Sequence, residues 1–404
     1  MIAVARGLLI LCVPGLLLLC GLPFLLRGGQ VDIMGWALPA MPILAGAGWV
    51  LGRARLKTVL WLAVGAVGGV VLFGVLAADR LPRPLPVLLL LAVGCATGAG
   101  GALLRARATG ALALWTVAGL AWFAGQPAPI RQADERPALA VITALPLFWR
   151  EGEHGLAARA DAPVIALLRR RFDLRPLDSA LAPELQGARL LLLAQPRDMA
   201  AAELVAVDQW VRRGGRIVVL ADPLLRWPSP LALGDRRRAP PVSLLGPLLD
   251  HWGVKLAPPA TTGEQRHFLP DGSLLTSMAA SRFEVRGNHC GAEADGLIAR
   301  CRIGRGEAVL IADADLLDDR LWLADPDQPF SSRHWSADTP ALLTQWLGQS
   351  LPGERHWVRS EDRLLRAFRW AILAGMFWAG LGWALFERGR EGIPGPSQHA
   401  GEAG

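Results

Sequence analysis

The fold is decided by Leu190-Leu-Leu-Leu-Ala-Gln-Pro196 and by Val211-Arg-Arg-Gly-Gly-Arg-Ile-Val-Val-Leu-Ala-Asp-Pro223. Each stretch contains a short apolar run that predicts a buried strand, at residues 189–194 and 217–221. Between the strands, residues 199–213 have the apolar spacing of an amphipathic helix, which Gly214-Gly215 end. Because buried parallel strands are continuous apolar runs that alternate with helices, the sequence predicts an α/β domain with a parallel, helix-covered sheet.

The same alternation extends on both sides of this unit. The further predicted elements are a strand at 138–145, a helix capped by Asp161, a strand at 174–177, a helix at 242–252, a hairpin at 297–312 and a helix at 340–348 capped by Asp338. Together they predict one soluble domain, with its linker to the membrane, over residues 126–369.

Long apolar runs surround this domain. The chain of 404 residues is 52% hydrophobic, which is too apolar for an ordinary soluble protein. Runs long enough to cross a bilayer lie at 7–26, 33–52, 58–78, 85–104, 108–125 and 370–386. The sequence therefore predicts five transmembrane helices within residues 1–125, a C-terminal transmembrane helix at 370–386 and a disordered cytoplasmic tail at 387–404. We expect a multi-pass protein of the inner membrane, embedded in the lipid bilayer.

Positive charge is concentrated in the loops of the membrane part. Residues 1–125 contain nine Lys and Arg residues but only two acids, Asp32 and Asp79, which accounts for the whole net charge of +7. The high pI therefore reflects basic loops, and nucleic-acid binding is not expected.

Most of these basic residues fall in inside loops if the N-terminus is cytoplasmic. Both termini are then cytoplasmic, and the soluble domain is extracytoplasmic, in the periplasm of a Gram-negative envelope. Four arginines just before the last span argue the other way, namely Arg359, Arg363, Arg366 and Arg369.

Two cysteines, Cys290 and Cys301, belong to the soluble domain. Outside the cytoplasm a disulfide between them would persist, and two free buried thiols are the alternative. The sequence leaves both states open.

The order of the soluble elements resembles the auxiliary domain of ABC-type transport systems, the GldG-like family, whose fold is similar to that of class I glutamine amidotransferases. The resemblance rests on the two stretches quoted above and on Gly304-Arg-Gly-Glu-Ala-Val-Leu-Ile-Ala-Asp-Ala-Asp315, and it covers about residues 136–348. It implies a Rossmann-like, amidotransferase-like fold in a non-catalytic partner of a transporter complex. The five leading spans depart from the simpler anchoring that is usual in that family.

A class I amidotransferase needs a cysteine on a sharp turn between a strand and a helix. Here the strand at 217–221 ends in Asp222-Pro223, and neither soluble cysteine follows a parallel strand. The histidines lack the spacing of metal ligands. The acids from Asp313 to Asp319 are better explained as caps of a strand end, since no glycine-kinked loop surrounds an ion there. We therefore expect no catalytic residue, no cofactor and no metal.

One candidate ligand site follows from the predicted sheet, because ligands bind beyond the carboxyl ends of parallel strands. Large or charged side chains follow three of these ends, namely Trp149 and Arg150, Arg197 and Asp198, and Asp222, Arg226 and Trp227. If they converge, they would suit a glycan or an anionic polymer of the envelope. The simpler interpretation is that Trp149 and Trp227 anchor their loops and that Asp198 caps its helix.

The leading interpretation is a non-enzymatic accessory subunit whose extracytoplasmic domain binds a partner or an envelope ligand for an ABC-type assembly. Because the sequence has no Walker motif, the ATPase of that assembly would be a separate chain. One alternative is an envelope enzyme that acts on a glycan or a lipid-linked substrate through Asp222 or the acids from Asp313 to Asp319. Another is a scaffold that works with a MoxR-type ATPase, which similar domains also accompany.

Overall fold

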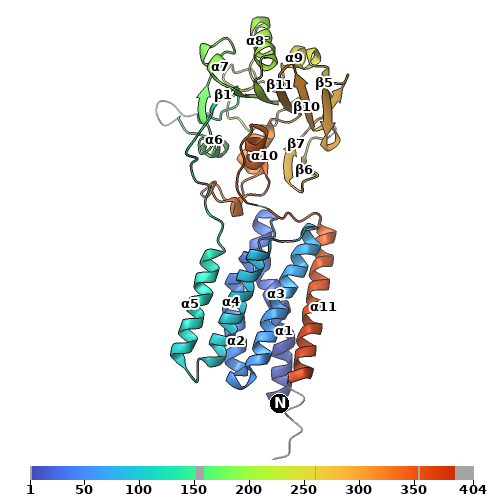
Figure 1. Cartoon of the computed structure of the whole chain (residues 1–404). Helices are drawn as coiled ribbons and strands as arrows, with labels where there is room; N and C mark the ends of the chain where they lie inside the picture. The colour runs from blue at the N-terminus through green and yellow to red at the C-terminus, as the bar shows by residue number, and fades with distance from the viewer. Residues whose placement is uncertain (1, 152–158, 260, 354, 387–404) are drawn as a thin grey trace, which may run out of the picture. The chain divides into compact units, whose positions relative to one another are not determined.

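The computed structural model describes residues 2–151, 159–259, 261–353 and 355–386. The chain divides into two compact units, which are coloured along the chain in Figure 1. The helical unit comprises residues 1–126 and 356–404, and the α/β unit comprises residues 127–355. The tail predicted at 387–404 lies outside the described residues.

The helical unit consists of apolar helices with short connections. Its helices are α1 (Ile2–Gly28), α2 (Ala37–Leu51), α3 (Leu56–Ala78), α4 (Pro84–Leu103), α5 (Ala108–Ala124) and α11 (Glu361–Phe386), and its 3₁₀ turns are Ile33–Trp36 and Arg53–Arg55. Within the described ranges, five helical segments are long and apolar enough to cross a membrane.

The predicted span at 108–125 corresponds to α5, which is shorter than these five. It begins after Arg107 and ends at Ala124, so it has 17 residues. That length is about 26 Å, against roughly 30 Å of hydrocarbon in a bilayer.

Two tryptophans join α3 to α11. The rings of Trp61 and Trp378 stack with their centroids 4.2 Å apart. Each indole Nε1 donates to the backbone oxygen of the other tryptophan at 2.9 Å. Gly65 and Gly382 make room for the two rings, because a Cβ at either position would lie within 2.3 Å of an indole atom. The contact between these helices therefore depends on small residues opposite large ones, as is common in membrane helices.

Helix α11 begins at Glu361, nine residues before the span predicted at 370–386. Ser360 Oγ accepts from the backbone N–H of Arg363 at 3.2 Å, and Glu361 and Asp362 complement the positive end of the helix dipole. Two of the four arginines noted in this region have partners at the end of α3. Arg363 forms an ion pair with Asp79 at 2.8 Å, and the side chain of Arg359 donates to Ala78 O at 3.3 Å.

The α/β unit is built on a seven-stranded sheet. In sheet order its strands are β2 (Asp173–Pro176), β1 (Ala138–Thr143), β3 (Leu190–Ala194), β4 (Arg216–Leu220), β11 (Gly306–Ile311), β10 (Ile298–Ile303) and β9 (Cys290–Glu293). The strands from β2 to β11 pair in parallel, and β10 and β9 are antiparallel. The predicted α/β class with a mostly parallel sheet is confirmed.

Short helices and two small sheets complete this unit. The helices are α6 (Pro163–Leu168), α7 (Pro183–Gly187), α8 (Ala201–Arg212), α9 (Gly246–His251) and α10 (Thr339–Trp346), and the additional strand pairs are β5 (Val254–Leu256) with β8 (Phe283–Val285) and β6 (Glu264–Phe268) with β7 (Leu274–Met278). The buried Trp210 of α8 donates through Nε1 to Leu185 O at 3.0 Å, which holds α8 against the end of α7.

Two predicted helix caps are wrong, and a third predicted cap occupies the right position without a capping hydrogen bond from its side chain. The N-cap of α6 is Ala162, and Asp161 instead forms an ion pair with Arg169. Helix α8 begins at Ala201, where Glu203 accepts from the N–H of Ala200 at 2.9 Å, so Asp198 is not its cap. Asp338 does occupy the N-cap position of α10, but its side chain accepts from the N–H of Leu274 at 2.8 Å and pairs with Arg355.

Candidate functional site

Two neighbouring parallel strands, β4 and β11, end in acidic residues. Asp222 lies two positions beyond the end of β4, and Asp313 lies two positions beyond the end of β11. Asp315 opens a 3₁₀ turn, Asp315–Leu317. Because β4 and β11 pair in parallel, with Leu220 opposite Ile311, both strands end at the same edge of the sheet. This register brings the three carboxyl groups together.

The carboxyl groups of Asp222, Asp313 and Asp315 form one buried cluster, here the carboxylate cluster. One oxygen from each residue lies within 4.8 Å of the others. The exposed fractions of the three residues are 0%, 0% and 2%. Asp318 and Asp319, which the sequence groups with these acids, are not members. Asp318 pairs with Arg320 at 2.5 Å instead.

Backbone N–H groups from three segments bind the carboxylate cluster. Asp222 accepts from Leu224 at 2.7 Å and from Ala314 at 3.0 Å. Asp313 accepts from Met278, at the end of β7, at 2.7 Å and from Leu316 at 3.1 Å. Asp315 Oδ2 accepts from Arg226 at 2.6 Å. The cluster therefore fastens the loop after β4 and the end of β7 to the end of β11.

Burial and mutual repulsion disfavour ionisation of the carboxylate cluster. Burial is the main cause that raises the pKa of Asp222, and backbone donors oppose it. Burial raises the pKa of Asp313 well above its usual value, and the charges of Asp222 and Asp315 add to the effect. Burial raises the pKa of Asp315 to about 7. Three charges at this position would therefore need compensation by protons or by a cation.

Gln195, which directly follows β3, supports the cluster, although it is not among the predicted site residues. Its buried side chain accepts from the N–H of Asp222 at 2.9 Å and donates to Pro240 O at 3.0 Å. Its backbone lies in the left-handed region, with a φ of 41°. A weak signal was present, since a polar residue followed by proline occurs just after each of the two adjacent strands, as Gln195-Pro196 after β3 and as Asp222-Pro223 after β4.

The structure only partly brings together the residues of the predicted ligand site. Asp222 is buried in the carboxylate cluster, which Arg226 joins through its backbone N–H while its side chain is exposed. Trp227 is half-buried and lines a pocket of about 10 Å³ with Glu151 and Ser229, which is room for about one water molecule. Trp149 is half-buried and Arg150 is exposed, and neither lines this pocket.

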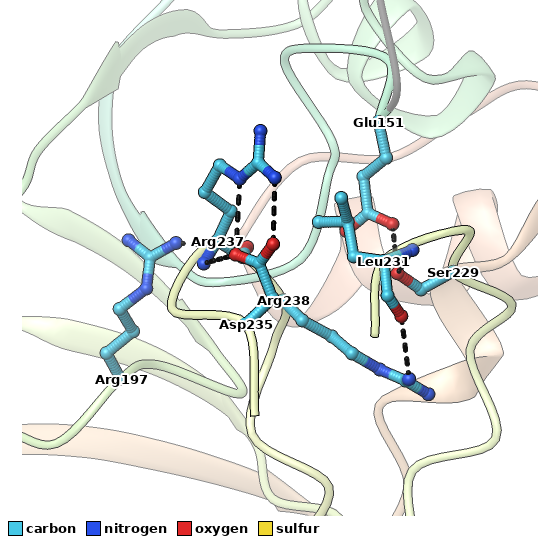
Figure 2. Close-up of polar contacts among 7 residues, drawn as sticks. All are labelled: Glu151, Arg197, Ser229, Leu231, Asp235, Arg237 and Arg238. Atoms are coloured by element: carbon cyan, nitrogen blue, oxygen red, sulfur yellow. Dashed lines mark hydrogen bonds and ion pairs between the residues drawn. The ribbon is translucent and has the colours of Figure 1, made fainter. Parts of the chain in front are cut away.

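Of the predicted residues Arg197 and Asp198, Arg197 lies beside an arginine-rich loop, as Figure 2 shows. Arg197 is exposed and donates to Arg237 O at 3.2 Å, and Asp198 is also exposed. Arg237 itself pairs with Asp235 at 2.8 Å, and Arg238 donates to Leu231 O at 3.1 Å. These three arginines thus hold the loop in its own conformation.

Cys290 and Cys301 are joined by a disulfide between β9 and β10. The two residues are opposite each other in the antiparallel register, with their Cα atoms 4.0 Å apart. The bond fixes the β9 edge of the seven-stranded sheet to β10.

Comparisons with solved structures give only distant similarity. The exo-beta-1,4-mannosidase Op5Man5 from Opitutaceae bacterium strain TAV5 is 13% identical, with a TM-score of 0.35, and the match covers 60% of this chain and 40% of that one. The cold-adapted beta-galactosidase from Rahnella sp. R3 is 13% identical, with a TM-score of 0.30, and the match covers 67% of this chain and 43% of that one. The chain thus spans less than half the length of either enzyme, and no function is inferred from them.

No curated protein matches the chain. A family match does exist for residues 136–271, which correspond to the family described as ABC-type uncharacterized transport system. This range contains β1, β3, β4 and the first member of the carboxylate cluster, Asp222. The family match confirms the predicted resemblance to the ABC transport auxiliary domain over residues 136–271.

Proposed function

We propose that this protein is a non-catalytic accessory subunit of an ABC-type transport assembly, anchored in the inner membrane with its α/β unit outside the cytoplasm. The observation that carries the proposal is the combination of an ABC transport auxiliary domain with five helical segments long enough to cross a bilayer. The α/β unit binds a partner subunit or an envelope ligand on behalf of the assembly.

Two observations support the position outside the cytoplasm. Disulfides persist in oxidising compartments and are rare in the cytosol, and Cys290 and Cys301 are paired. The arginines before α11, which oppose this orientation in a count of loop charges, include two with local partners at the end of α3. The basic loop from Arg53 to Lys57, which lies on the inside in this orientation, carries three positive charges and no acid.

The strand ends support a binding role rather than catalysis. Neither cysteine nor serine directly follows β1, β3, β4 or β11 among the described residues. The carboxylate cluster is buried, and its oxygens accept mainly from backbone N–H groups, so these acids have no open path to a substrate. These features of the described residues favour a binding role over catalysis.

The proposed assembly can be tested by recovering it from native membranes. We expect affinity-tagged full-length chain, solubilised in a mild detergent, to retain a membrane permease and a Walker-motif ATPase in near-equal amounts. A matched chain that lacks residues 127–355 keeps the helical unit and loses the auxiliary domain, and it should lose one or both subunits. Quantitative mass spectrometry measures the recovered chains.

Recovery of the full-length chain with no ATPase would contradict the proposal. So would recovery with a MoxR-type ATPase and no permease. That second result would favour the scaffold interpretation instead.

A further inference from the structure

The carboxylate cluster carries more negative charge than its surroundings compensate. Asp222, Asp313 and Asp315 are at least 98% buried. The positive charge of Arg320 lowers the pKa of Asp315 only as the weakest of several causes, and its guanidinium is paired with Asp318 at 2.5 Å. An uncompensated charge in a protein interior costs several kcal/mol, so three adjacent carboxylates need protons or a bound cation.

One oxygen of the carboxylate cluster is left without a donor. Five of the six oxygens accept backbone N–H groups, from Leu224, Ala314, Met278, Leu316 and Arg226. The sixth, Asp315 Oδ1, is fully buried and has no hydrogen-bond partner among the described residues. Buried polar atoms are nearly always satisfied, so an orphaned carboxylate oxygen within a group of acids indicates a missing ligand.

We propose that Asp222, Asp313 and Asp315 bind one hard divalent cation of the Ca²⁺ and Mg²⁺ class. All the side-chain ligands are carboxylate oxygens, which these ions prefer, and no His or Cys belongs to the cluster. Oxygens on opposite sides of Ca²⁺ are about 4.6–5.2 Å apart, and those around Mg²⁺ about 4.0–4.2 Å. The separations within 4.8 Å fit a single ion of either kind, and Ca²⁺ is the better candidate because Mg²⁺ gives up its bound water reluctantly.

The cation would have a structural role. Through the backbone donors of the cluster it would bind together the loop that follows β4, the end of β7 and the 3₁₀ turn that follows β11. Asp222 follows β4 and Asp313 follows β11, and these two strands pair in parallel. The ion would therefore hold their ends together at this edge of the sheet.

Thermal unfolding of the full-length chain in detergent tests the site. The protein is first stripped with EDTA and dialysed, and then CaCl₂, MgCl₂ or NaCl is added at matched ionic strength. We expect saturating Ca²⁺ to raise the melting temperature of the α/β unit by about 5–10 °C, with a smaller shift from Mg²⁺ and none from NaCl. Hydrogen exchange should locate the added protection at residues 222–226, 278 and 313–317.

Two variants separate the site from general charge effects. Asp315→Asn removes the negative charge of the carboxylate to which the orphaned oxygen belongs. This variant should therefore lose the rise in melting temperature with Ca²⁺. Without metal, it should melt no lower than the wild type. Asp319→Asn is the matched control, because this acid lies in the same segment but outside the carboxylate cluster, and it should keep the full shift. Metal analysis of the wild type after gel filtration in CaCl₂ should find one calcium per chain.

The proposal is overturned if neither Ca²⁺ nor Mg²⁺ shifts the wild type, because the cluster is then compensated by protons alone. It is also overturned if Asp315→Asn shows the wild-type shift. If Asp315→Asn fails to fold, the calcium content of the wild type decides, and a value near zero excludes the site.

Discussion

Replacement of Asp338 by alanine is expected to lower the free energy of unfolding of the α/β unit by about 3–5 kcal/mol. The side chain of Asp338 is 3% exposed and pairs with Arg355, whose side chain is 9% exposed. It also accepts from the N–H of Leu274 at 2.8 Å, which joins α10 to β7. Without the carboxylate, the guanidinium of Arg355 stays buried and uncompensated, with the ring of Trp335 5.2 Å away as a weaker partner.

Hydrogen exchange of the strand amides in the full-length chain measures this loss. The matched control is Glu293→Ala, which breaks an ion pair with Arg300 at 2.9 Å in which both side chains are 46% exposed. Exposed pairs contribute at most about 1 kcal/mol, so the control should change little. Equal losses in the two variants would show that burial of the Asp338 pair has no energetic consequence.

Replacement of Gly306 by alanine should be at least as damaging. A Cβ at this position would lie 2.1 Å from Val211 O and 2.4 Å from Gly215 O. Both are backbone atoms, one near the end of α8 and one just before β4, so no side-chain rotation relieves the clash. Gly306 begins β11, which pairs with both β4 and β10. We expect a loss of at least about 3 kcal/mol, or failure to fold.

The control for this variant is Gly291→Ala in β9, where an added Cβ meets nothing within 4 Å. It should fold with near-normal stability. Yield, circular dichroism and hydrogen exchange of the two variants give the comparison. A stable Gly306→Ala protein would mean that α8 does not approach β11 as closely as described.

The fold was predictable where apolar periodicity is strong. Leu190 to Ala194 and Ile217 to Leu220 are buried strands as predicted, because short continuous apolar runs between helices admit few other structures. Caps were less predictable. Asp161 lies one residue before the cap position of α6 and pairs with Arg169, and Asp338 lies at the cap position of α10 but pairs with Arg355. Such competition depends on tertiary contacts that local spacing does not contain.

The site was predictable only in part, because it depends on strand order. Selection of Asp222 followed from its place after a strand, and Asp313 and Asp315 were correctly located after the hairpin. That β11 lies beside β4, and so brings these acids together, could not be derived from the sequence. Arg150 and Asp198 were also predicted to line the ligand site because they follow strand ends, but both are exposed. A position after a strand end is therefore not enough to bring side chains together in one site.

The central claim is that the α/β unit lies outside the cytoplasm, and cysteine labelling tests this claim directly. Leu233 is 80% exposed in the α/β unit, and Arg55 lies in a predicted inside loop. In full-length chains whose free cysteines Cys12, Cys20 and Cys95 are replaced by serine, Leu233→Cys or Arg55→Cys is treated with a membrane-impermeant maleimide in intact spheroplasts. We predict labelling of Leu233→Cys in intact spheroplasts and of Arg55→Cys only after lysis. The reverse pattern would place the α/β unit in the cytoplasm and contradict the account.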